Sequence, residues 1–216
     1  MHVDDHYRGQ REELSALALG LTEGQLATTV PGCPLWTVRD LLGHLVGLPQ
    51  DVLEGTMANA ASPDWTAAQV EARRNRSVPE LVEEWSRTGP LFEAGLEARG
   101  FLGWVFTYDV TMHGDDLREA LGLPLGTSST HQLVLDGIIE RARTRADGLG
   151  SLTLRAGERT WELGAGDPAA TLTVPDEGEL ARVIGARRDD DAVRALDWTG
   201  DPEPWLPVLP LFRPGR

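Results

Sequence analysis

The 216-residue chain contains no lysine and a single cysteine, Cys33. One cysteine excludes a disulfide within the chain and favours a reducing compartment. No apolar run approaches the roughly 18–20 residues that span a bilayer. The first residues, MHVDDHYRGQREE, lack the apolar segment of a signal peptide. We therefore expect a cytoplasmic protein.

Positive charge is also scarce. The chain has 20 arginines and 34 acidic residues, so its formal net charge is −14. Binding to nucleic acid requires a basic face that neutralises phosphates. Docking on an anionic membrane surface requires the same excess of basic residues. We expect neither nucleic acid nor a membrane among the partners. The hydrophobic fraction of 41% is ordinary for a folded globular protein.

Residues 1–124 show the apolar repeat of amphipathic helices. One helix is expected to start at Thr37, a suitable N-cap, because apolar residues follow at positions 41, 45, 48 and 52. Pro49 is expected to kink or split it. A capping box at Ser77–Glu80 predicts another helix start, with Gly89-Pro90 as the weak point of that helix.

Two further helices are expected in this half, one around Leu14 and one over residues 101–121. Residues 29–34 are interpreted as a loop, and residues 60–76 as a polar connection. Helices joined by short or moderate loops favour an antiparallel four-helix bundle.

The pattern changes in residues 130–216, which are predicted to form a small α+β domain. Trp205 and Phe212 are expected to anchor its proline-rich tail. The expected elements are a helix over 131–147, a hairpin of strands 152–154 and 160–163, a strand over 170–174 and a helix over 177–186. The fold class predicted for the whole chain is therefore α+β, with domains 1–124 and 130–216.

Two of the five histidines, His44 and His113, lie on apolar helical faces, whereas His2 and His6 are expected in a frayed N-terminus. Asp109 is four residues before His113, so both share one helix face. A buried acid and histidine are costly unless something satisfies them. Three interpretations remain open: a structural hydrogen-bonded pair, a catalytic acid–base pair, or two ligands of a divalent ion with His44 as the third.

Other candidate residues have simpler interpretations. Cys33 is interpreted as a packed loop residue rather than a nucleophile, because no base lies beside it in the sequence. Trp36 is expected to plug the entry of the helix that follows it. Arg118 is expected to pair with Asp115 or Glu119. The two acids Asp115 and Asp116 are expected at a solvated helix end, with a contact from one of them to His113 as the alternative.

Two sequence blocks resemble a known family. CPLWTVRDLLGHL (Cys33–Leu45) and DVTMHGDDLREALG (Asp109–Gly122) are similar to two motifs of the mycothiol-dependent maleylpyruvate isomerase family, which belongs to the DinB-like metal-binding bundles. The resemblance implies that His44, Asp109 and His113 bind a divalent metal, often zinc. It also implies a small sterol-carrier-like C-terminal domain. The family carries glutamate where this chain has Asp109.

The resemblance further implies an enzyme with a small-molecule substrate. A low-molecular-weight thiol such as mycothiol would bind at the open position of the metal and add as a thiolate to an electrophile. The outcome would be isomerisation or S-transfer. Arg213, with Arg187 and Arg188, is a candidate for binding an anionic substrate. The alternatives are a non-catalytic protein that binds a metal or small ligand, and a structural protein that forms oligomers.

Overall fold

The computed structural model describes residues 2–210, apart from the side chains of residues 128, 141 and 142. The predicted anchor Phe212 and the predicted anion-binding Arg213 lie outside the described residues. The described chain divides into two compact units between Leu125 and Gly126. Helices and strands both contribute to it, so the predicted α+β class is confirmed. Within residues 2–210, no helix combines the length and apolar character needed to cross a bilayer.

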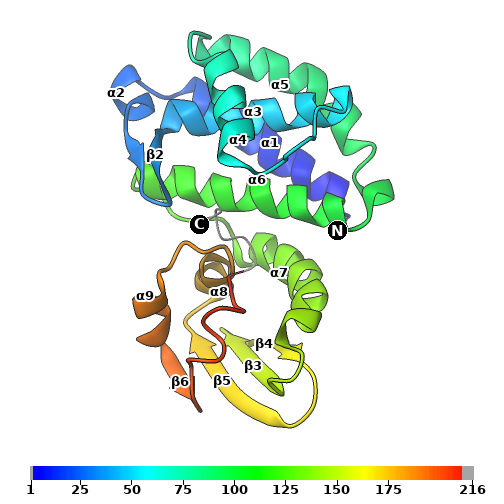
Figure 1. The fold of residues 1–216 in the computed structure, drawn as a ribbon. Helices are drawn as coiled ribbons and strands as arrows, with labels where there is room; N and C mark the ends of the chain where they lie inside the picture. The colour runs from blue at the N-terminus through cyan, green and yellow to red at the C-terminus, as the bar shows by residue number, and fades with distance from the viewer. Residues whose placement is uncertain (1, 211–216) are drawn as a thin grey trace. The chain divides into compact units, whose positions relative to one another are not determined.

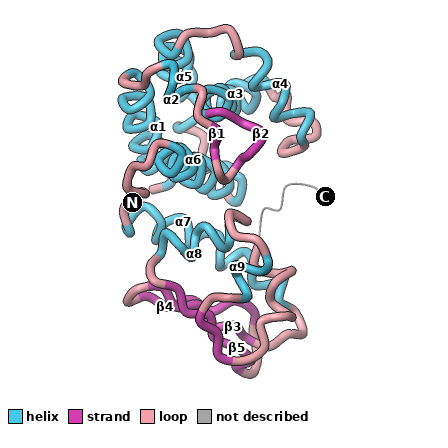
Figure 2. Tube along the Cα trace, turned by 90° about the vertical axis from the view of Figure 1, so that its left-hand side faces the viewer, coloured by secondary structure: helices cyan, strands magenta, loops and turns pink. Residues whose placement is uncertain are grey.

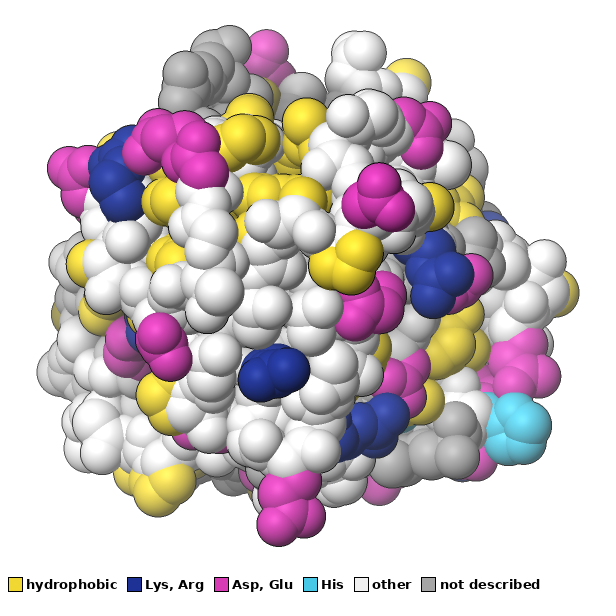
Figure 3. Space-filling view, turned by 90° about the horizontal axis from the view of Figure 1, so that it is seen from below, with side chains coloured by type: hydrophobic (Ala, Val, Ile, Leu, Met, Phe, Trp, Pro, Cys, Tyr) yellow, Lys and Arg dark blue, Asp and Glu magenta, His cyan; other side chains and the backbone are white. Residues whose placement is uncertain are grey.

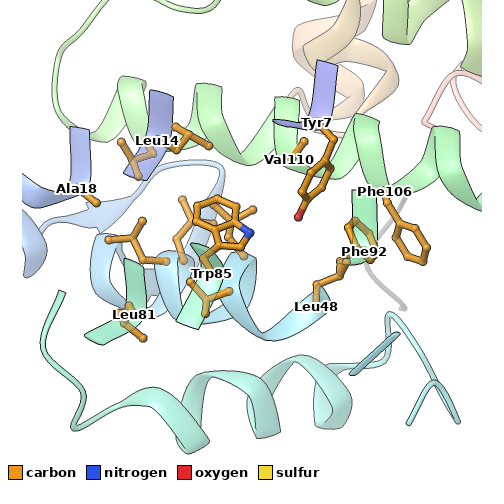
Figure 4. Close-up of a cluster of buried hydrophobic side chains, with 14 of the residues drawn as sticks. Tyr7, Leu14, Ala18, Leu48, Leu81, Trp85, Phe92, Phe106 and Val110 are labelled. Carbon is orange, nitrogen blue, oxygen red and sulfur yellow. The ribbon is translucent and has the colours of Figure 1, made fainter. Parts of the chain in front are cut away.

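A four-helix bundle forms the first unit, as predicted (Figure 1). Helices α1 and α3 each pack against both α5 and α6. Figure 4 shows side chains of all four helices meeting around Trp85 of α5, which is only 1% exposed. The four helices are α1 (Val3–Leu19), α3 (Val38–Glu54), α5 (Val78–Glu93) and α6 (Phe101–Ala120).

Two internal prolines do not end their helices. A kink or a split was expected at Pro49, and the split is wrong because helix α3 runs unbroken through it. Leu45, Leu48 and Val52 are buried on both sides of the proline, and their packing outweighs the lost backbone hydrogen bond. Helix α5 likewise continues through Gly89-Pro90.

Gly89 has a packing role in α5. A Cβ at this position would lie 2.5 Å from Cδ of Arg11 on α1, so only glycine admits that side chain. Arg11 Nε donates to Glu93, also on α5, at 2.5 Å. The predicted weak point is therefore the place where α1 approaches α5.

The start of α1 also differs from the expectation. The helix begins at Val3, so His6 is not in a frayed terminus but is 4% exposed. Its Nε2 lies 3.0 Å from the hydroxyl oxygen of Thr111 on α6. His2 remains exposed.

The predicted loop over 29–34 contains part of a hairpin. After the one-turn helix α2 (Glu23–Leu26), strand β1 (Thr29–Val30) pairs antiparallel with β2 (Cys33–Thr37). This hairpin packs against α3 and α6. The N-cap prediction for Thr37 is confirmed, because its side chain accepts from the Asp40 amide in a capping box.

The predicted polar connection over 60–76 is wrong, because helix α4 (Pro63–Arg73) lies within it. Ser62 caps its first turn by accepting from the Trp65 amide, and Pro63 occupies the first turn. The spacing of apolar residues did not predict this helix, because two of its three buried side chains, Gln69 and Arg73, are polar. The 3₁₀ turn η1 (Glu97–Arg99) joins α5 to α6.

The second unit is built on a four-stranded sheet in the order β4-β3-β5-β6. Strand β3 pairs antiparallel with β4 and parallel with β5, and β5 pairs antiparallel with β6. The predicted hairpin and third strand are confirmed, whereas β6 and α9 were not expected. The elements are α7 (Ser128–Ala142), η2 (Arg143–Ala146), β3 (Ser151–Ala156), β4 (Arg159–Gly164), β5 (Pro168–Val174), α8 (Glu177–Ile184), α9 (Asp190–Arg194) and β6 (Asp197–Thr199).

Helices α7 and α8 pack together and cover one face of this sheet (Figure 2). The alternate residues Leu152 and Leu154 of β3 are fully buried, which follows from the two-residue period of a strand. Trp205 is 2% exposed, as expected for an anchor of the tail. On the face shown in Figure 3, acidic side chains of the described residues are spread among uncharged ones, with arginines beside some of them.

Candidate metal site

The structure brings His44, Asp109 and His113 together inside the first unit. His44 comes from α3, and the other two are one turn apart on α6. Nε2 of His44 lies 3.6 Å from Oδ2 of Asp109, and Nε2 of His113 lies 3.5 Å from Oδ1 of the same carboxylate. One ligating atom from each residue falls within 4.8 Å of the others.

The three side chains differ in exposure. The side chain of His44 is 4% exposed and that of His113 is 10% exposed, whereas that of Asp109 is 27% exposed. The imidazole rings stand edge to face with their centroids 5.1 Å apart. The cluster is therefore buried at its histidines and reaches solvent beside the carboxylate of Asp109.

Behind His44 lies a hydrogen-bonded chain of two residues. Nδ1 of His44 is 2.6 Å from Oε1 of Gln69, and Nε2 of Gln69 donates to Oδ2 of Asp51 at 2.6 Å. A carboxylate accepts hydrogen bonds only, so the amide nitrogen of Gln69 must face Asp51. Its oxygen then faces His44 and accepts a hydrogen bond from the N–H group at Nδ1. The lone pair of His44 is thereby left on Nε2, which faces Asp109.

His113 has an acceptor of its own. Its Nδ1 is 3.0 Å from Oδ2 of Asp116, which is fully buried. The predicted contact between His113 and one of the two acids is therefore present. The expectation of a solvated helix end is wrong, because Asp115 is also buried, 4.0 Å from Arg118. In the neutral imidazole, a proton on Nδ1 of His113 again leaves the lone pair on Nε2, which faces Asp109.

The donor set fits a divalent cation. Nε2 of each histidine faces the carboxylate of Asp109 across a distance longer than an ordinary hydrogen bond. Two ligands about 2.0–2.1 Å from zinc at tetrahedral angles stand about 3.3–3.4 Å apart, close to both observed separations. Nitrogen, nitrogen and oxygen donors also suit zinc, and three protein ligands leave a fourth position open.

Two tryptophans border the histidines. The Trp36 ring centroid lies 5.1 Å from that of His44 and 5.9 Å from that of His113, so the expected helix plug also covers both imidazoles. Trp65 of α4 stands edge to face with His44 at 6.5 Å. These rings lower the polarity around the nitrogen donors, which strengthens electrostatic interactions there.

Cys33 lies near this cluster, and Arg118 follows His113 by five residues on α6. Sγ of Cys33 is 3.9 Å from Oδ2 of Asp116, so the partly buried thiol packs behind His113. Cys33, His113 and Asp116 also lie close enough to hold an ion, but Nδ1 of His113 is engaged by Asp116 in this arrangement. Arg118 is buried, lies 4.0 Å from Asp115, one of its two expected partners, and donates to Glu13 of α1 at 2.6 Å.

Sequence reasoning missed Asp51, Trp65 and Gln69. Asp51 lies seven residues after His44, which places both on one face of α3. Trp65 and Gln69 are on the unpredicted helix α4, which the Ser62-Pro63 start signal would have revealed. Of the arginines proposed to bind an anion, Arg188 pairs with Glu179 within the second unit, at 2.6 Å.

A comparison with known protein families identifies the same family that the two sequence blocks resemble. Residues 7–118, more than half of the chain, match the mycothiol maleylpyruvate isomerase N-terminal domain. The chain belongs to this family. The matched region includes His44, Asp109 and His113.

Two solved structures are similar in fold to most of this chain. One is a mycothiol-dependent maleylpyruvate isomerase, with a TM-score of 0.58 over 88% of this chain and 91% of the other. The second is a histidine-to-alanine mutant of a mycothiol-dependent maleylpyruvate isomerase, with a TM-score of 0.56 over 87% of this chain and 90% of the other. Both are 12% identical to this chain, so the likeness establishes a shared fold. No curated protein matches the chain.

Proposed function

We propose that this protein is a metal-dependent enzyme that uses mycothiol, or a similar low-molecular-weight thiol, to act on an electrophilic small molecule. The observation that carries the proposal is the convergence of the Nε2 atoms of His44 and His113 on the carboxylate of Asp109. Family membership supports the thiol. The names of the two similar structures favour isomerisation over S-transfer. The single cysteine supports a cytoplasmic location.

The three ligating side chains would hold the ion, with zinc as the metal proposed. A divalent ion bound there acts as a Lewis acid that lowers the pKa of a thiol at its open position. Gln69 and Asp116 keep the Nδ1 protons away from the ion. Asp109 is the most exposed of the three ligands, so the thiol and the electrophile would enter beside it.

The protein's own residues also control water. Trp36 lies against both imidazoles, and Trp65 borders His44 from α4. A dry environment at the nitrogens increases the effect of charge on a bound thiol. The exposed edge at Asp109 still admits a proton acceptor from solvent.

The proposal is tested by turnover of maleylpyruvate with mycothiol. Metal-free and zinc-loaded protein are assayed with and without the thiol, with the variant His113→Ala as a control. Turnover that needs both zinc and thiol, and is lost in the variant, is the expected result. Equal turnover without the metal would overturn the proposal. Zinc binding without turnover across a panel of electrophiles would instead establish a non-catalytic binding protein.

A further inference from the structure

The chain of hydrogen bonds from Asp51 through Gln69 to His44 has only one chemically consistent direction. Asp51 accepts from Nε2 of Gln69 at 2.6 Å, so the amide cannot turn over without placing its oxygen against a carboxylate. The oxygen of Gln69 therefore faces Nδ1 of His44, also at 2.6 Å. Which imidazole nitrogen carries the proton is set by the partner of the other nitrogen.

The packing of α4 against α3 holds this amide in place. Gln69 is 2% exposed, and its Cβ would lie 2.9 Å from a Cβ at position 47. Gly47 of α3 therefore permits the close approach that brings Gln69 beside His44. A buried amide with both ends bonded has little freedom to adopt another rotamer.

From this geometry we infer that Gln69, oriented by Asp51, is a positioning residue that holds His44 as the Nδ1–H tautomer and directs its Nε2 lone pair at the metal. The role for the ion rests on the proposed function, whereas the tautomer is a property of the metal-free protein. Asp51 acts only through Gln69, because it lies one full amide group away from the imidazole.

The two histidines are thus supported differently. His113 donates directly to a fully buried carboxylate, Asp116, whereas a neutral amide stands between His44 and Asp51. A carboxylate increases the basicity of an imidazole more than an amide does. Loss of Gln69 should therefore disturb the orientation of the His44 imidazole more than its basicity.

The test uses nitrogen NMR of metal-free protein at a pH where imidazole is neutral, together with zinc affinity measured by chelator competition. The variants are Gln69→Leu, which removes the acceptor, and Asp51→Leu, which removes its support without touching His44. Asp51→Asn keeps an oxygen that can accept from Gln69. Gln50→Leu is the matched control, because Gln50 lies on α3 and donates to Glu54 instead.

Wild-type protein, Q50L and D51N should show the Nδ1–H tautomer at His44. Q69L and D51L should lose it and bind zinc about 10–100-fold more weakly. Circular dichroism confirms that each variant is folded, and D51L provides the result if Q69L fails to fold. An Nε2–H tautomer in the wild type, or an unchanged tautomer in folded Q69L or D51L, would overturn the inference. If wild-type protein binds no zinc, the proposed function fails and the tautomer measurement still decides this inference.

Discussion

Nε2 of His113 lies 3.5 Å from Oδ1 of Asp109, one turn earlier on α6. This separation is longer than a hydrogen bond and close to the distance between two ligands of one zinc ion. Because Nδ1 of His113 donates to Asp116, the neutral form of the imidazole presents the lone pair of Nε2 to the carboxylate of Asp109. A divalent cation between the two groups would make this contact favourable, and the first two predictions below separate that arrangement from a structural pair.

The first prediction concerns metal content. Purified protein should carry about one divalent ion per chain by elemental analysis. His44→Ala and His113→Ala should each lose the ion, because two remaining ligands hold it weakly. His2→Ala is the control, since His2 is exposed and outside the site. Full metal content in both site variants would contradict the assignment.

A second prediction concerns Asp109, the position at which the resemblance to the family leads one to expect glutamate. Asp109→Glu keeps a charged oxygen donor, whereas Asp109→Asn keeps the size of the side chain and removes the charge. Zinc affinity should therefore fall more in D109N than in D109E. Chelator competition measures both constants. A greater loss in D109E would show that side-chain length, rather than charge, decides binding at this position.

How much of this site could be predicted depended on whether its contacts were local. Helical spacing predicted that His44, Asp109 and His113 point into the bundle, because burial of one helix face is a local property, whereas their role as ligands came from the family resemblance. The position of Gln69 could not be predicted in this way. It lies beside His44 because α4 packs against Gly47, and the spacing of apolar residues does not reveal such a contact. The four-helix bundle was predictable for the same local reason.

Asp116 shows a second limit of local reasoning. Its spacing of three residues from His113 was visible, but an Asp-Asp pair near a helix end is usually solvated. Burial of Asp116 is set by tertiary packing, which brings Cys33 of the hairpin to 3.9 Å from its carboxylate. The short strands β1 and β2 escaped prediction because the segment between them, Pro31-Gly32, is typical of a loop.

A third prediction follows from the contact between Asp116 and His113. Asp116→Asn removes the charge that supports the imidazole, so zinc affinity should fall about 10-fold, the lower end of the range for such contacts. Cys33→Ser is the companion variant, because its contact with the same carboxylate is longer. C33S should bind zinc as the wild type does. A larger loss in C33S than in D116N would assign the main role to the thiol.

A fourth prediction concerns the buried ion pair between α1 and α5. The side chains of Glu93 and Arg11 are 2% and 9% exposed, and Glu93→Gln leaves the arginine without a buried counter-charge. The free energy of unfolding should fall by about 3 kcal/mol, as when one partner of a buried pair is removed. Urea denaturation measures this change.

The control for that pair is Glu12→Gln. Glu12 also contacts Arg11, at 3.4 Å, but its side chain is 63% exposed. Exposed ion pairs contribute about 0–1 kcal/mol, so E12Q should be close to wild type in stability. Equal losses in E12Q and E93Q would show that burial does not determine the contribution of these contacts.

The last prediction uses the absence of lysine, which leaves few groups that titrate near pH 10. Burial raises the pKa of the Tyr7 phenol above its ordinary value of about 10. The folded protein then keeps this proton where the unfolded chain releases it. The stabilisation is complete below about pH 10 and is lost as the pH rises further, at up to about 1.4 kcal/mol per pH unit.

Tyr7→Phe should therefore show a smaller decrease of the free energy of unfolding between about pH 10 and 11, measured by denaturant titration at each pH. The slope is compared rather than the absolute stability, because the substitution also removes a buried hydroxyl. Equal slopes in both proteins would show that Tyr7 does not titrate differently in the folded and unfolded states.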